Sequence, residues 1–292
     1  MYELIQVGKN SYFVQSPCNV GIVRTNDTDV VLIDSGSDKD AGRRVRQILD
    51  DHGWHLTAIF NTHSHADHIG GNPYLQARTG CKIYVPGTDC DFTNHTMLEP
   101  AFLYGGFPPE ELRNKAWMAQ ASTAQLLTEA SLPEGMSIVP LPGHSFDMVG
   151  YQTQDDVIFL ADCLSSQKIL NKYQVGYIYN VKQYLETLEM VKTLKAALFI
   201  PAHVEPLSEI ASLAQVNIDQ VNEIADVICD ICREPVWLEI LLQRLCSAYG
   251  VAMSFKQYVL MGSTLRSYLS WLKDGGRLTV CFENGQMFWI TV

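Results

Sequence analysis

Four side chains that can bind a metal ion lie within six consecutive residues, and this string constrains the fold more than any other feature of the chain. His63, His65, Asp67 and His68 directly follow the apolar run TAIFNT and precede Ile-Gly-Gly. Three imidazoles and a carboxylate on a glycine-bounded loop at the end of a strand have little use other than metal binding. The string therefore predicts a metal centre at the carboxyl end of a buried strand.

Short apolar runs alternate with helical segments along most of the chain. The runs are rich in Val, Ile and Phe and lie at 30–34, 57–62, 82–86, 137–141, 157–162 and 198–203. Runs of this kind are typical of strands that are buried on both faces. Between them, one helix is predicted to end at Gly53, and another to begin at Asn72-Pro73 and end at Gly80. The alternation predicts an α/β fold with helices on the outside.

Three further side chains that can bind metal follow later predicted strands. His144 comes after the run 137–141, Asp162 ends the run 157–162, and His203 ends the run 198–203. Taken singly, a histidine after a strand is more often a hydrogen-bonded loop residue, and an aspartate at a strand end is more often a helix cap. Their shared position at strand ends makes them candidates for the same metal centre.

The motif His-x-His-x-Asp-His, with Asp34-Ser35-Gly36 upstream and the three later residues in this order, resembles the signature of the metallo-β-lactamase superfamily. The resemblance covers roughly residues 10–205 and implies an αββα sandwich. It also implies two divalent metal ions, with Zn as the first expectation and Fe or Mn as alternatives. By this resemblance His63, His65 and His144 hold the first ion, Asp67, His68 and His203 hold the second, and Asp162 bridges both. Asp34 and Thr62 would orient the ligand imidazoles.

The resemblance predicts a metal-dependent hydrolase in which a metal-bridged hydroxide attacks the substrate. Asp67 is the predicted catalytic residue, because a carboxylate beside the water can relay its proton to the leaving group. The complete ligand set is similar to that of the glyoxalase II branch of thioester hydrolases, so a small ester, thioester or lactone is the expected substrate. The candidate substrate contacts are Lys168, Lys172, Tyr173 and Tyr177. Alternatively, these four residues belong to a solvated loop, in which the lysines face water, the tyrosines pack on the protein, and none contacts the substrate.

Other functions are compatible with the same motif. A phosphodiesterase or ribonuclease is one, because a branch of the superfamily with a similar small C-terminal domain cuts RNA. Against it, the net charge is −11, and the acidic excess lies entirely in residues 1–232, since residues 233–292 carry 6 Lys and Arg against 4 Asp and Glu. An acidic surface repels phosphates, so nucleic acid is disfavoured and a small-molecule substrate is expected. Persulfide dioxygenases, which use one iron, share much of the His-x-His-x-Asp-His motif. A mononuclear oxygenase is therefore another alternative.

A DNA-binding regulator with a vestigial metal site is the third alternative. It would need a basic recognition helix. The candidate segment, GSTLRSYLSWLKDGG, contains only Arg266 and Lys273 as cations among several large apolar residues. This composition is typical of a buried or dimer-forming helix.

The pattern of the chain changes near residue 233 and predicts two domains. Residues 1–232 form the predicted catalytic domain, with an insertion at about 90–130 that either packs on its own domain or a partner, or overhangs the site as a substrate-lining lid. Residues 233–292 are predicted to form a small winged-helix-like α+β domain. Its helices are expected at 235–250 and about 255–273, followed by a hairpin that turns at Asn284-Gly285. Its exposed apolar side chains make a homodimer one expectation.

The composition predicts an ordinary cytoplasmic protein that does not enter a membrane. No apolar run reaches the roughly 18 residues of a membrane span, and residues 1–13 lack the pattern of a signal peptide. The eight cysteines are scattered and do not form the dense framework of a small secreted protein. Cys229 and Cys232, at helical spacing, are predicted to lie in the core side of a helix.

Overall fold

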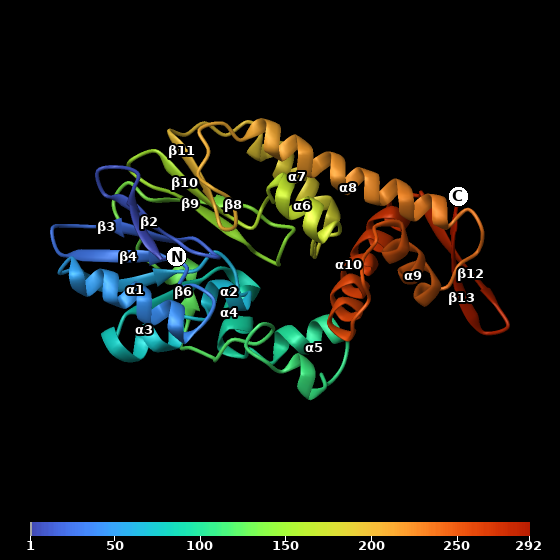
Figure 1. The fold of residues 1–292 in the computed structure, drawn as a ribbon, viewed down its shortest axis with the longest axis horizontal. Coiled ribbons are helices and arrows are strands. Elements are labelled where there is room, and N and C mark those ends of the chain that lie inside the picture. The colour runs from blue at the N-terminus through green and yellow to red at the C-terminus, as the bar shows by residue number, and fades with distance from the viewer. Residues whose placement is uncertain (1) are drawn as a thin grey trace.

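The structure, a computed structural model, describes residues 2–292 and contains two β-sheets packed face to face between layers of helices (Figure 1). The first sheet has seven strands in the order β1 (Glu3–Gln6), β2 (Ser11–Gln15), β3 (Val20–Arg24), β4 (Asp29–Ile33), β5 (His55–Phe60), β6 (Lys82–Val85) and β7 (Gln125–Leu126). The second sheet has four strands in the order β11 (Leu198–Pro201), β10 (Val157–Ala161), β9 (Val149–Gln152) and β8 (Ser137–Pro140). Strands β1 to β4 form an antiparallel meander, whereas β4, β5 and β6 are parallel.

Three apolar layers hold the sandwich together, and strand β4 shows how the sequence builds two of them. Leu32 points toward helices α1 (Lys39–Asp51) and α3 (Asn72–Thr79), while its neighbours Val31 and Ile33 point into the space between the sheets. This alternation is the period of two that a strand imposes on its side chains. The outer face of the second sheet packs on α7 (Val181–Val191) and α8 (Ala211–Ile231). The predicted α/β class and αββα layering are confirmed.

The six apolar runs coincide with strands β4, β5, β6, β8, β10 and β11. The prediction that each run is buried on both faces is wrong for the run 137–141. Strand β8 is the edge strand of the second sheet, and three of its four residues are exposed. Helices α1 and α3 lie where the capping pattern placed them. Asp38 caps α1 with its carboxylate, and Gly80 ends α3 in the left-handed conformation.

The remaining helices surround the carboxyl ends of the strands. These are α2 (Ala66–Ile69), α4 (Gly87–Asn94), α5 (Leu98–Tyr104) and α6 (Gln167–Tyr173), with short 3-10 turns at Glu110–Leu112 and Leu127–Glu129. The 90–130 insertion thus contains most of α4, all of α5 and both short turns. Leu103 of α5 and Leu112 are buried against Val259 of the C-terminal region. The insertion therefore packs on that region.

The C-terminal region consists of α9 (Leu238–Ala248), α10 (Phe255–Asp274) and the hairpin β12 (Leu278–Glu283) and β13 (Gln286–Thr291). Asn284 and Gly285 have φ angles of 50° and 79°, as a tight two-residue hairpin requires. Figure 1 shows these elements at the far end of α8, with α10 reaching back toward α5. One face of α10 is buried through Leu265, Tyr268 and Leu269, which agrees with the expectation of a buried helix.

Cys229 and Cys232 are both buried at the end of α8, in the core that the C-terminal helices share, as predicted. None of the helices within residues 2–292 has the combination of length and hydropathy that would let it span a membrane.

Candidate metal centre

His63, His65 and His144 bring three imidazole nitrogens together where β5 and β8 end. The Nδ1 atom of His65 lies 3.0 Å from His63 Nε2 and 3.0 Å from His144 Nε2. His63 is completely buried, and the other two rings are largely covered. A neutral imidazole carries one N–H and one lone pair, so three nitrogens cannot all satisfy one another with protons. A shared cation would satisfy all three.

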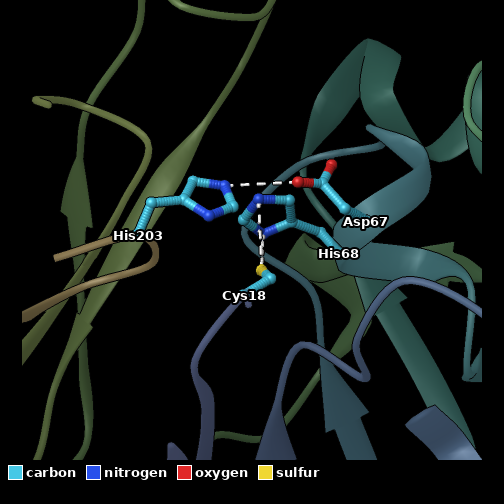
Figure 2. Close-up of side chains that lie close together, drawn as sticks. All are labelled: Cys18, Asp67, His68 and His203. Atoms are coloured by element: carbon cyan, nitrogen blue, oxygen red, sulfur yellow. Dashed lines mark hydrogen bonds and ion pairs between the residues drawn. The ribbon is translucent and has the colours of Figure 1, made fainter. Parts of the chain in front are cut away.

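Asp67, His68 and His203 form a second group (Figure 2). It lies beside the first, since the ring centroids of His63 and His68 are 4.1 Å apart. His203 Nε2 lies 3.2 Å from Asp67 Oδ2. Cys18, from the loop after β2, joins this group, with its Sγ 3.6 Å from His68 Nε2. Each of these four residues offers a ligand atom within 4.8 Å of the others. The sequence motif contained no signal for Cys18, which lies 45 residues or more upstream of the histidine string.

Asp162 connects the two groups. Its Oδ1 lies 3.3 Å from His68 Nε2, and its Oδ2 lies 3.5 Å from His144 Nε2 and 3.4 Å from His203 Nε2. Oδ1 is buried and receives no hydrogen bond from the described residues. A buried carboxylate oxygen without a donor is costly unless a cation compensates its charge. The donor set therefore fits metal ions on both sides of Asp162.

The first group is built to be neutral. Burial is the main cause that lowers the pKa of His65 to about 4, and burial together with the neighbouring His65 imidazole lowers that of His144 to about 4. Burial together with the charges of His68 and His65 also holds the pKa of His63 well below its usual value. Neutral imidazole is the form that binds a metal ion, so these rings need not lose a proton to do so at pH 7.

The second group is rich in negative charge. The Asp162 carboxylate raises the pKa of His203 to about 12. Burial would raise the pKa of Asp67, but His68 and His203 outweigh it and lower that pKa to about 2. For His68 burial acts in the opposite direction and would lower the pKa. Cys18 and the carboxylates of Asp162 and Asp34 outweigh burial and raise this pKa well above its usual value. Such surroundings favour cations, which would displace the imidazole protons.

Asp34 organises the ligand loop from beneath. Its carboxylate accepts hydrogen bonds from the Thr62 amide at 2.8 Å, from the Thr62 hydroxyl at 2.8 Å and from His68 Nδ1 at 2.7 Å. The Thr62 hydroxyl in turn lies 3.0 Å from His63 Nδ1. When Nδ1 is engaged in this way, the Nε2 atoms of His63 and His68 face the centre.

Backbone carbonyl groups orient the imidazoles of His144 and His203 in the same manner, so that their Nε2 atoms face the centre. His144 Nδ1 lies 3.2 Å from the Tyr177 carbonyl oxygen, and His203 Nδ1 lies 2.7 Å from that of Pro17. The Pro17 contact also ties the loop that carries Cys18 to the end of β11. The Tyr177 contact similarly ties the segment after α6 to His144.

Asp89, in α4, joins the two loops that carry the first group, and the sequence analysis missed it. Its carboxylate accepts hydrogen bonds from the Ser64 amide at 3.0 Å, the Ser64 hydroxyl at 2.7 Å and the Asp147 amide at 2.9 Å. The side chain is fully buried, and burial raises its pKa. A signal existed, because Asp89 follows the predicted strand 82–86 just as the other site residues follow theirs.

Gly70 and Gly71 let the chain after α2 pass close to the segment that follows Asp34. A Cβ atom on Gly70 would lie 2.2 Å from the Ser37 carbonyl oxygen, and one on Gly71 would lie 2.2 Å from that of Ser35. Both approaches are too close for any side chain. The glycine pair is therefore required for Asp67 and His68 to reach the centre.

A cavity of about 460 Å³ opens beside the metal centre. Its floor contains the side chains of His65, Asp67, His144, Asp162 and His203. Its walls come from the insertion, through Leu103 and Trp117, and from α6 and α10. The insertion therefore lines the site as well as packing on the C-terminal region.

Two of the four candidate substrate contacts lie at this cavity. Tyr173 and Tyr177 are part of its wall. Lys168 and Lys172 are exposed and are not among the lining residues, and the Lys172 ammonium donates to the Tyr173 hydroxyl at 2.9 Å. The structure thus brings the tyrosines to the cavity but not the lysines, because α6 turns its charged side chains outward to water.

Comparison with known proteins identifies the family. The model of the Metallo-beta-lactamase superfamily matches residues 14–203. The chain is 30% identical over 123 residues to a hydroxyacylglutathione hydrolase of Nitrobacter hamburgensis, and 39% identical over 67 residues to one of Maricaulis maris. These matches cover 42% and 23% of the chain, and only 39% and 21% of the two enzymes.

Solved structures share the fold over the entire chain. A beta-lactamase domain protein of Burkholderia ambifaria matches with a TM-score of 0.74 at 16% identity, covering 99% of this chain and 95% of that one. A metallo-beta-lactamase family protein of Thermus thermophilus matches with a TM-score of 0.72 at 14% identity, covering 100% and 98%. The chain therefore belongs to the metallo-β-lactamase superfamily.

Proposed function

We propose that the chain binds two divalent metal ions, Zn in the first place, and hydrolyses a small ester, thioester or lactone. The position of Asp162 carries the dinuclear proposal, because its carboxylate contacts histidines of both groups and keeps one oxygen without a hydrogen bond. His63, His65 and His144 would hold one ion, and Asp67, His68 and His203 the other. Imidazole and carboxylate ligands suit Zn, and the Cys18 thiol beside the second group adds a soft donor that Fe or Mn would favour less.

When bound, the two ions would supply an activated water and polarise the carbonyl oxygen of the substrate. The side chains have separate tasks around that chemistry. The Asp67 side chain is 42% exposed at the cavity, so its carboxylate can reach a water there and relay a proton to the leaving group. Asp34 and Thr62 keep the Nε2 atoms of His63 and His68 directed at the centre.

The charge of the cavity supports an acyl substrate over a phosphodiester. No Lys or Arg is among the lining residues. A nucleic acid brings several phosphates, and those beyond the proposed metal ions would find no cationic side chain in this cavity to neutralise them. The hydroxyacylglutathione hydrolases that match part of the chain support a thioester. We therefore rank the ribonuclease function second.

Metal analysis and a substrate panel test the proposal together. Elemental analysis of metal-saturated protein is expected to give two ions per chain. Asp162→Ala should lower the metal content and reduce turnover by at least about 100-fold, since even groups that only orient metal ligands typically contribute about 10-fold to 100-fold. Asp51→Ala, an exposed aspartate at the end of α1, is the matched control and should change neither value.

The panel compares a thioester, a lactone, bis(p-nitrophenyl) phosphate and a short RNA with one metal-replete preparation. Either carbonyl substrate is expected to have the highest kcat/KM. If a phosphate substrate exceeded every acyl substrate about tenfold, a difference of about 1.4 kcal/mol in transition-state binding, the ribonuclease function would take first place.

A further inference from the structure

We propose that the cavity selects substrates whose acyl group is neutral and apolar, of roughly six carbons or more, while the leaving group stays outside it. The inference rests on the proposed hydrolase function and names the substrate class for the same site. Its basis is the wall of the cavity, where apolar side chains from three helices and one connecting segment meet. These side chains are Leu103 of α5, Trp117 of the insertion, Ile169 and Leu170 of α6, and Leu260 of α10.

The wall is assembled by packing between distant parts of the chain. Leu103 is buried with Leu112 and Val259 in a small core, against which Trp117 and Tyr177 pack. Val259 and Leu260 are neighbours on α10, so the residue that anchors this core stands next to one that faces the cavity. The apolar wall is therefore fixed by tertiary contacts and offers an acyl chain a preformed surface.

The apolar wall, which has no basic side chain, excludes anionic acyl groups. Glu99 lines the cavity, with its side chain 13% exposed, and it offers no positive charge in either protonation state. None of the lining residues is Lys or Arg. A carboxylate on the acyl chain would be desolvated against Leu103, Trp117 and Leu260 without a cationic side chain beside it, which is a strongly unfavourable arrangement.

The charged groups of a carrier such as glutathione would also lose their hydration if the carrier entered the cavity. A thioester carbonyl must sit at the metal centre, so one half of the molecule enters the cavity and the other half extends toward solvent. The half that can be desolvated against Leu103, Trp117 and Leu260 is the uncharged one. For a thioester on a charged carrier, this is the acyl group.

The volume of the cavity limits the size of the acyl group. About 460 Å³ lies within the usual range for small-molecule sites, and an acetyl group would leave most of it without contact. Each methylene that becomes buried contributes about 0.8 kcal/mol, or roughly fourfold in kcat/KM, until the cavity is filled. Longer neutral acyl groups should therefore be preferred up to that limit.

Thioesters of N-acetylcysteamine test this directly, because their carrier is small and uncharged. The acyl groups are acetyl, butyryl, hexanoyl and octanoyl, with succinyl as the anionic counterpart of butyryl. We expect kcat/KM to rise at least tenfold from acetyl to hexanoyl and to be at least tenfold lower for succinyl than for butyryl. Leu260→Ala should reduce the hexanoyl to acetyl ratio at least threefold. Leu238→Ala, which truncates a half-buried leucine of α9 that does not line the cavity, should leave the ratio unchanged.

A binding measurement separates this inference from the proposed hydrolase function. Ketone analogues, in which a methylene replaces the thioester sulfur, cannot be hydrolysed, and their binding can be followed by calorimetry. The hexanoyl analogue should bind at least tenfold tighter than the acetyl analogue. If no thioester is turned over but this preference is found, the hydrolase proposal fails and the cavity assignment stands. Equal binding of the acetyl and hexanoyl analogues, or none of either, would overturn the inference whatever the turnover.

Discussion

Asp89 positions two candidate ligands without touching the metal centre. Its carboxylate holds the Ser64 amide, between His63 and His65, and the Asp147 amide, three residues after His144. We expect Asp89→Ala to weaken metal binding by the first group about 10-fold to 100-fold, because groups that orient ligands typically contribute this much. Competition with a fluorescent chelator measures the affinity.

Asp91 provides the control for that variant. It lies on the same helix, α4, but is exposed. Asp91→Ala should therefore leave the metal affinity within twofold of the original. Equal affinities for the two variants would show that Asp89 is a fold residue with no influence on the ligand loops.

Glu99 gives the stability of the protein a pH dependence of defined sign. Burial, with a smaller contribution from Asp89, raises its pKa to about 8, whereas an unfolded glutamate titrates near 4.3. Between these values the folded chain holds a proton that the unfolded chain releases, so this group makes the free energy of unfolding fall as the pH rises. The decrease is at most about 1.4 kcal/mol per pH unit.

Glu99→Gln removes this titration. The free energy of unfolding of the variant, relative to the original protein, should therefore increase between pH 5 and pH 8. Urea unfolding of chelator-treated protein is the measurement, since a bound cation would lower the carboxyl pKa. Glu110→Gln, an exposed glutamate of the same insertion, should give a constant difference. A constant difference for Glu99→Gln as well would mean that its carboxyl is ionised in the folded state.

At the residue scale, the sequence predicted the side chains that belong to a motif and missed those that do not. The seven candidate ligands could be found because each follows a predicted strand, and the carboxyl ends of these strands meet. Cys18 and Glu99 reach the site through loop and helix packing that no local pattern encodes, whereas Asp89 follows the predicted strand 82–86 and could have been found. The direction of Lys168 and Lys172 could not be predicted either, because it depends on which face of α6 is covered.

At the scale of elements, the glycines after α2 determine whether the ligand loop can form. A Cβ atom on Gly70 would meet the Ser37 carbonyl and the Asp38 amide, both part of the backbone, so neither neighbour can simply rotate away. We expect Gly70→Ala to cost more than about 2 kcal/mol and to lower the Tm by at least about 5 °C. Calorimetry of the metal-free protein measures this.

Gly106→Ala is the matched substitution. Its Cβ would lie 4.0 Å from its nearest neighbour, the Tyr104 ring, and its φ is not in the left-handed region. The Tm should change by less than about 2 °C. A similar small change for Gly70→Ala would show that the chain after Asp34 can move aside.

Element prediction succeeded where one local signal was enough. The apolar runs, the Asn-Gly turn and the glycine helix ends each depend on a few neighbouring residues. The edge position of β8 depends instead on the order of strands in the sheet, which no single run reveals. The same is true of the cavity, whose walls come from residues more than 150 positions apart.

At the scale of the whole molecule, one apolar core crosses the predicted boundary near residue 233. Helix α8 packs against α7 and the second sheet at its start, through Ala214 and Ile218, and the core continues along it to Leu241 of α9 and Leu269 of α10. Polar contacts follow the same path. The Thr291 amide donates to the Cys232 carbonyl at 2.8 Å, and Arg277 pairs with Asp226 at 2.7 Å.

This continuity predicts that the chain unfolds in one cooperative transition, because loss of the C-terminal helices would expose the apolar side of α8. Two tryptophans report on opposite ends of the molecule. Trp54 packs on Tyr12 at the first sheet, and Trp289 lies in β13, where it pairs with Val236. Two variants, each keeping one of these tryptophans and replacing the other four with Phe, should show urea midpoints that agree within about 0.2 M in metal-free protein. A Trp289 transition that is complete before the Trp54 transition begins would instead establish residues 233–292 as a separately folding domain.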